Sequence, residues 1–105
     1  MYRLVVLFAV VLVPPGAAAA AEHVVAMKDG AYAPDRVRAK AGDTIRFVNG
    51  DTVDHEVFVP TVGFAVDLGK QEPGKEAVLR LGKAGSFEAE CVFHQNMLLE
   101  VEVAP

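Results

Sequence analysis

The sequence predicts an all-β sandwich or barrel for residues 22–105. Three observations support this fold class. No segment of this region keeps the 3.6-residue period of a long helix. Short runs instead alternate between apolar and polar residues or are rich in β-branched residues, which is typical of strands. Gly, Pro, Asn and Asp separate these runs at the spacing that all-β sandwiches and barrels commonly show.

Seven runs are expected to form strands, and turn residues lie between them. The runs HVVAM, RVRA, TIRFVN and HEVFVP come first, and EAVLRL, SFEAECV and LLEVEV follow. Turn signals such as Lys28-Asp29-Gly30 and Glu72-Pro73-Gly74 separate neighbouring runs. The expected strands are residues 23–27, 36–39, 44–49, 55–60, 76–81, 86–92 and 98–103.

The alternation in the last two runs indicates which side chains face the core. In residues 86–92, Phe87, Ala89 and Cys91 fall on one face, and two glutamates fall on the other. Because glutamates are rarely buried, Cys91 is expected to point inward at the end of its strand. Residues 98–103 alternate in the same way. The segment CVFHQNM, residues 91–97, is therefore expected to form the loop between two adjacent strands.

The N-terminus has the pattern of a secretory signal peptide. The start MYR is short and basic, the apolar run LVVLFAVVLV follows it, and the alanines Ala17 to Ala21 offer a small-residue cleavage site. The apolar run is shorter than the roughly 20 residues of a membrane-spanning helix. We expect residues 1–21 to be removed, leaving a periplasmic domain of residues 22–105 without stable membrane insertion. An uncleaved N-terminal anchor is the alternative.

Charge and cysteine content limit the possible partners. The chain has 10 Lys and Arg against 14 Asp and Glu, a formal net charge of −4. An acidic protein without basic clusters is not expected to bind nucleic acid or an anionic membrane, but it suits a positively charged protein partner. The single cysteine cannot form an internal disulfide. A solvated face is expected from the carboxylates Asp51, Asp54, Glu88, Glu100 and Glu102.

Cys91, His94 and Met97 place a thiol, an imidazole and a thioether at even spacing on one loop. His55 begins an apolar run directly after a turn-rich segment, so it could supply a second imidazole from another strand. Two His and one Cys in a trigonal arrangement, with a weakly bound axial Met, form the geometry of a blue-copper electron-transfer site. The alternatives are an inert buried cysteine and a methionine that serves only for packing.

His23 supports a separate hypothesis about the N-terminus. If cleavage occurs after Ala20, the chain begins Ala21-Glu22-His23. A free amine, two amides and a third-position imidazole can then bind Cu(II) or Ni(II) in a square plane. Cleavage after Ala21 would abolish this site.

The sequence resembles the cupredoxins, small blue copper proteins of the plastocyanin and azurin type. YAPDRVRAKAGDTIRFVNGDTVDHEV, residues 32–57, is similar to the first half of the family, in which a Gly-Asp turn and an Asn-Gly-Asp segment lead to the first His ligand. Residues 64–97 are similar to the second half, which ends in C-x-x-H-x-x-M. The short ligand spacing resembles amicyanin. The Phe-x-x-Asp-Leu-Gly pattern resembles plastocyanin-like proteins associated with methylamine utilisation.

The resemblance implies a Greek-key β-sandwich or barrel of about seven to eight strands that holds one type 1 copper ion, Cu(I) or Cu(II). It implies His55, Cys91 and His94 as the equatorial ligands and Met97 as the axial ligand. The clearest departure is Glu56, which stands where the family usually has an Asn that ties the two ligand loops together. Smaller departures flank the ligand loop, at Ala89, Glu90, Leu98 and Leu99.

The implied function is one-electron transfer, not enzymatic catalysis. The edge of His94 is expected to reach the surface within an apolar ring of Phe93, Leu98, Pro60 and Val59. Such a ring suits transient docking of a monomeric carrier to a c-type cytochrome or a dehydrogenase. A copper-binding or copper-delivery protein without redox turnover is the alternative. A thiol hydrolase is disfavoured because no oxyanion-hole signature accompanies the cysteine, and a structural zinc site because Met is a poor zinc ligand.

Overall fold

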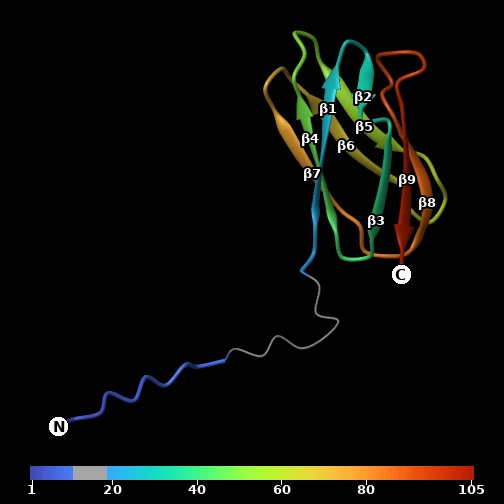
Figure 1. Cartoon of the computed structure of the whole chain (residues 1–105). Helices are drawn as coiled ribbons and strands as arrows, with labels where there is room; N and C mark the ends of the chain where they lie inside the picture. The colour runs from blue at the N-terminus through green and yellow to red at the C-terminus, as the bar shows by residue number, and fades with distance from the viewer. Residues whose placement is uncertain (11–18) are drawn as a thin grey trace.

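The computed structural model describes residues 1–10 and 19–105, and every regular element in them is a β-strand (Figure 1). Two sheets pack face to face around one apolar core. Within these residues no helix is long and apolar enough to cross a membrane. The strands are β1 Glu22–Lys28, β2 Ala31–Ala33, β3 Arg36–Lys40, β4 Thr44–Asn49, β5 His55–Val59, β6 Val66–Gln71, β7 Glu76–Arg80, β8 Gly85–Glu90 and β9 Leu98–Ala104.

The sheet topology brings β5, β8 and β9 together. One sheet has the strand order β2-β1-β4-β7, and the other has the order β3-β9-β8-β5-β6. Neighbouring strands run antiparallel except in two pairs, β1 with β4 and β3 with β9, which run parallel. The candidate ligands border β5, β8 and β9, which are consecutive in the second sheet, so the topology concentrates these residues in one place.

The all-β prediction is confirmed, but the described residues contain nine strands and not seven or eight. The two strands without a predicted run are β2 and β6. β2 has three residues, AYA, which is too short to show a period. β6, VDLGKQ, carries a glycine and two charged residues in place of a regular alternation. β2 and β6 form strands because they pair with β1 and β5, and not because of their own sequence pattern.

The core is built from the inward faces of both sheets. Among the described side chains, Ile45 and Phe47 of β4 and Leu99 of β9 are fully buried. Burial of one such side chain contributes roughly 1.5–3 kcal/mol, so a few of them supply much of the stability of a small domain. Phe58 does not belong to the core, because it lies half-buried on the outer face of β5. The alternation of that strand buries His55 and the two valines instead.

The structure does not test the predicted signal peptide. Residues 11–18, which include Ala17, Ala18 and the Pro-Pro-Gly segment, lie outside the described residues. Residues 1–10 are exposed. Cleavage after Ala20 or Ala21 stays a prediction.

The Lys28-Asp29-Gly30 turn signal is confirmed as the hairpin between β1 and β2. Asp29 and Gly30 have φ values of 54° and 70°. Two central residues with positive φ define the type I′ hairpin turn that Asp-Gly favours. The hairpin carries Gly30 to His94, since a Cβ atom on Gly30 would lie 3.8 Å from His94 Cδ2.

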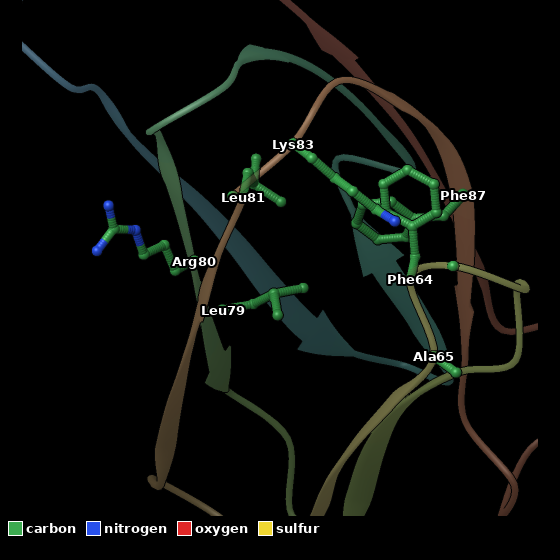
Figure 2. Close-up of a pocket in the computed structure, with 9 residues that line it drawn as sticks. Phe64, Ala65, Leu79, Arg80, Leu81, Lys83 and Phe87 are labelled. Carbon is green, nitrogen blue, oxygen red and sulfur yellow. The ribbon is translucent and has the colours of Figure 1, made fainter.

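Aromatic side chains pack together at the start of β8, which is the end of the strand away from Cys91. The rings of Phe64 and Phe87 stack with their centroids 5.3 Å apart, and Lys83 Nζ lies 4.6 Å from the Phe64 centroid. Figure 2 shows these side chains around a hollow of about 230 Å³, together with Leu79 and Leu81. Gly85 makes this packing possible, because it has a φ of 141° and a Cβ atom there would stand 2.5 Å from Phe64 Cζ.

Candidate metal centre

Three candidate ligands come from adjacent parts of the five-stranded sheet. His55 is the first residue of β5, Cys91 follows the last residue of β8, and His94 lies in the loop before β9. Because β5 and β8 are antiparallel neighbours, with Phe58 opposite Glu90, the start of β5 lies beside the end of β8. The predicted inward orientation of Cys91 is confirmed, since the residue is only 4% exposed.

Cys91, His55 and His94 converge on one point. Cys91 Sγ lies 3.9 Å from His55 Nδ1 and 3.6 Å from His94 Nδ1. The two imidazole rings have centroids 4.6 Å apart. One donor atom from each residue lies within 4.8 Å of the other two. His55 is fully buried and His94 is partly exposed, so the cluster reaches from the core to the surface.

The spacing of these atoms fits a three-coordinate metal site. Bond lengths of about 2.3 Å to sulfur and about 2.0 Å to nitrogen are typical of a comparable divalent metal, zinc. With ligands about 120° apart, as in a trigonal site, sulfur and nitrogen would lie about 3.7 Å from each other. The measured separations of 3.6 and 3.9 Å lie on either side of this value. The distances from the sulfur to both nitrogens therefore fit one ion held between the three donor atoms.

Met97 is buried in the same loop as Cys91 and His94. It is 1% exposed, and its carbonyl oxygen accepts a hydrogen bond from Cys91 N at 3.3 Å. His94 N donates to Cys91 O at 3.4 Å, and Asn96, with a φ of 61°, turns the chain between His94 and Met97. The loop thus closes on itself and holds Met97 against Cys91. The axial role of its thioether stays a prediction.

A comparison with known families decides the identity of the domain. Residues 2–101 match the family described as a cupredoxin-like domain. The chain is a cupredoxin. The resemblance seen in the sequence is therefore confirmed, and the His-Cys-His cluster has the geometry of a type 1 copper site.

Solved structures share the fold of this chain. The purple cupredoxin from Nitrosopumilus maritimus has a TM-score of 0.70 at 18% identity, covering 78% of this chain and 99% of that chain. A reduced amicyanin with a proline-to-phenylalanine substitution has a TM-score of 0.70 at 25% identity, covering 87% and 85%. A copper-containing nitrite reductase from Thermus scotoductus has a TM-score of 0.74 at 21% identity, but only 22% of that chain is covered. No curated protein sequence matches this cupredoxin.

A carboxylate fixes the buried imidazole of the cupredoxin site. His55 Nε2 lies 2.9 Å from Asp51 Oδ2, while the other ring nitrogen, Nδ1, faces Cys91. Asp51 Oδ2 also accepts a hydrogen bond from Asp29 N, and Asp51 Oδ1 accepts one from Thr52 N. The hydrogen bond from His55 is the main effect that lowers the pKa of Asp51. The ionised carboxylate therefore holds the proton of the imidazole on Nε2 and leaves Nδ1 free to bind a metal.

The prediction that Asp51 belongs to a solvated face is wrong, because its carboxylate contacts His55. Its position four residues before His55, in the turn that precedes β5, was the available signal. Beneath it lies Asn49, which is 1% exposed. Asn49 Nδ2 donates to the carbonyl oxygens of Val53 and Gln71 at 2.9 Å, and Asn49 Oδ1 accepts from Asp51 N at 2.9 Å. This buried amide fixes the turn that carries Asp51 and His55.

Glu56 acts on the site through its backbone. Its N–H donates to Cys91 Sγ at 3.3 Å, and its carbonyl oxygen accepts a hydrogen bond of 2.6 Å from the hydroxyl of Tyr32. Its side chain is half-buried, and burial, followed by repulsion from Asp67, raises the pKa of its carboxyl. The strand β5 is therefore still tied to the ligand loop at the position where the family usually has Asn, although the carboxyl itself does not make this link.

The apolar ring predicted around His94 is correct in part. Phe93 and Leu98 are exposed, and Val92 joins them with 61% exposure. The prediction for Val59 is wrong, because this side chain is fully buried on the same face of β5 as His55. Pro60 is exposed, but it follows the last residue of β5, whereas His55 is the first residue of this five-residue strand. Pro60 therefore lies away from the ligands. The patch near His94 consists of Val92, Phe93 and Leu98.

Proposed function

We propose that this cupredoxin is a small exported one-electron carrier, not an enzyme, and that His55, Cys91, His94 and Met97 hold one type 1 copper ion. The convergence of Cys91 Sγ with the two Nδ1 atoms at 3.6 and 3.9 Å carries this proposal. A thiolate, two imidazoles and a thioether are the ligands of blue-copper electron-transfer sites. Copper bound there would supply a one-electron couple between Cu(I) and Cu(II).

The chain prepares this site before any ion binds. Asp51 orients the ring of His55, and the Glu56 N–H donates to the Cys91 sulfur and stabilises its negative charge. His55 and Cys91 are buried, which excludes water from the sulfur. Because these groups are held by strands and by hydrogen bonds, they move little when the charge of the site changes by one unit. Little reorganisation is what a fast electron carrier requires.

The partly exposed His94 provides the route for the electron to the surface. Val92, Phe93 and Leu98 are 61%, 52% and 45% exposed, and they form a small apolar contact area next to the ligand loop. A small apolar area favours brief docking, because weak redox encounters bury little surface. The net charge of −4 favours a positively charged partner. We infer a redox protein such as a c-type cytochrome or a dehydrogenase, a periplasmic location and a monomeric carrier.

The visible absorption spectrum tests this function. The exported protein is mixed with Cu(II) and a mild oxidant, and we expect an intense blue band that ascorbate bleaches and oxidant restores. Cys91→Ser should lose the band and keep the fold, whereas His23→Gln, a change in a histidine outside the cluster, should keep the band. A blue Cys91→Ser protein would refute the site. Copper that stays bound without colour, and passes readily to an acceptor, would support the copper-delivery alternative instead.

A further inference from the structure

The residue just before β1 is fixed to the sandwich on both sides. Ala21 N donates to Asp43 Oδ1 at 2.9 Å, and Ala21 O accepts a hydrogen bond from Thr44 N at 3.0 Å. Asp43 lies in the turn between β3 and β4 and is 7% exposed. Its second oxygen, Oδ2, accepts from Lys40 N at 2.9 Å and lies 3.0 Å from His23 Nε2. A buried carboxylate therefore faces the first fixed residue of the domain.

We propose that Asp43 is the binding site for the α-ammonium group of Ala21, and that processing cuts the peptide bond between Ala20 and Ala21. The inference rests on the export that the proposed function assumes. Hydrolysis adds one water, breaks the C–N bond, leaves a carboxylate on Ala20 and frees the amine of Ala21, which takes up a proton. The Ala21 N–H group that donates to Asp43 Oδ1 then belongs to a positively charged ammonium group at the same position.

The competing cut, after Ala21, would remove both hydrogen bonds. Asp43 Oδ1 would lose its donor, and Thr44 N–H would lose its acceptor. Loss of these two hydrogen bonds is destabilising, whereas a charge-assisted hydrogen bond is about twice as strong as a neutral one. A chain that begins at Ala21 therefore keeps both hydrogen bonds and strengthens the one to Asp43.

The surroundings of Asp43 allow an ammonium group at this position. A surface hollow of about 430 Å³ lies against Ala21 and Asp43, and Ala19 forms part of its lining. The N–H groups of the ammonium that do not face Asp43 would therefore reach water. Arg38 and Lys40 also line the hollow. Arg38 lies 3.5 Å from Glu102, which offsets its charge, and Lys40 is exposed, so solvent screens its charge. The hydrogen bond with His23, followed by the backbone donors, lowers the pKa of Asp43 to about 2, so the carboxylate is ionised at neutral pH.

The same contacts disfavour the N-terminal Cu(II) or Ni(II) site considered from the sequence. That site would use the amine of Ala21 and the imidazole of His23. Asp43 engages both of these groups in the folded protein. Binding of such an ion would have to detach Ala21 from Asp43 and disturb the start of β1.

The test compares chains with defined N-termini. Metal-free proteins that begin at Ala21, at Glu22, and at Ala21 with an acetylated amine are made from a cleavable fusion and melted under one condition. We expect the free Ala21 chain to melt highest and the Glu22 chain about 8–16 °C lower, because it loses two hydrogen bonds and each corresponds to about 4–8 °C in a domain of this size. The acetylated chain, which keeps one N–H donor without charge, should lie between them.

Asp43→Asn is the matched variant, since it keeps the shape of the side chain and removes its charge. In this background the difference between the free and the acetylated Ala21 chains should disappear. Equal melting temperatures for the chains that begin at Ala21 and Glu22 would overturn the inference. The mass of the exported protein provides the second readout: a chain of residues 21–105 supports the cut, and a chain that begins at Glu22 or keeps residues 1–20 contradicts it.

The proposed function is judged separately on the same samples. β1 runs from Glu22 to the hairpin beside His94, so about 20 Å separates the N-terminus from the metal centre. After Cu(II) and a mild oxidant are added, the blue band should therefore be equal in all three chains. Its absence from all of them would refute the copper site, while the order of melting temperatures would still decide the role of Asp43.

Discussion

The Asp51 carboxylate lies 2.9 Å from His55 Nε2, on the side of the ring opposite to the cysteine. One acidic side chain thus fixes the orientation of a buried ligand and also accepts the N–H of Asp29 in the β1–β2 hairpin. Because that hairpin packs beside His94, Asp51 connects the surroundings of both histidines.

Asp51→Asn is expected to weaken copper binding by about 10–100-fold, the usual cost of losing a partner that orients a metal ligand. A neutral amide stabilises the imidazole less than a carboxylate does, so the reduction potential should rise. Competition titration with a chelator measures the affinity, and voltammetry measures the potential. Asp54→Asn is the control, because Asp54 lies in the same turn but is paired with Lys70 at 3.9 Å. Equal effects of the two substitutions would contradict this role for Asp51.

Met97→Gln is expected to keep copper and the blue colour but to lower the reduction potential, because an amide oxygen is a harder ligand than a thioether and favours Cu(II). A tenfold change in relative affinity for the two oxidation states corresponds to about 59 mV, and we expect a decrease of this order. Met97→Leu, which supplies no donor atom, should change the potential in the opposite direction. If neither variant shifts the potential in voltammetry, Met97 is not the axial ligand.

Gly85→Ala is expected to destabilise the domain by about 1–3 kcal/mol, since alanine must adopt a φ that L-residues avoid and its Cβ atom would collide with Phe64. Denaturant unfolding measures the loss. Gly82→Ala is a close control, because Gly82 lies in the connection just before β8, has no positive φ, and a Cβ atom there meets nothing within 4 Å. Both variants should keep the blue band. A Gly85→Ala protein as stable as Gly82→Ala would show that Phe64 moves aside without cost.

Tyr32 is expected to resist ionisation in alkaline solution. Burial is the main cause that raises the pKa of Tyr32 well above its usual value near 10, with the negative charges near it adding to the effect. Since the folded pKa exceeds the unfolded one, the neutral phenol stabilises the fold fully below pH of about 10, and stability falls as the pH rises further.

The ultraviolet absorption of the phenolate measures this behaviour in a chain that begins at Ala21, whose single tyrosine is Tyr32. We expect the phenolate band to appear together with loss of the β-sheet circular dichroism signal. The protein unfolded in guanidinium should show the band near pH 10. A folded protein that ionises near pH 10 would be inconsistent with the buried hydroxyl that donates to the Glu56 carbonyl.

Local alternation was sufficient to predict most of the second sheet. LLEVEV predicted residues 98–103 as a strand, and β9 is Leu98–Ala104 with Leu99 and both valines buried at alternate positions. The same pattern predicted the inward direction of Cys91, since one face of residues 86–92 carries two glutamates. β2 and β6 could not be predicted in this way, because their pairing partners and not their own residues make them strands.

The site was predicted only as far as its residue types allow. The soft donors of one loop and the family resemblance pointed to His55, Cys91, His94 and Met97, and the structure brings the first three together. The roles of Asp51 and Asn49 depend on how a turn folds back under β5, which no spacing rule contains. The prediction that Val59 lies in the exposed ring was wrong, although the alternation of β5 indicates that it is buried. Val59 lies on the same face of the strand as His55 and Val57, so it faces inward with them.

The parallel pairing of β3 with β9 has a consequence for the kinetics of folding. It joins residues 64 positions apart, such as Arg36 and Glu100, and closure of so long a chain segment is slow compared with the formation of a hairpin. β9 also anchors one end of the loop that carries His94 and Met97. The ligand cluster should therefore be among the last native contacts to form. With Cu(II) in excess, the time course of the blue colour would report the final step of sheet assembly.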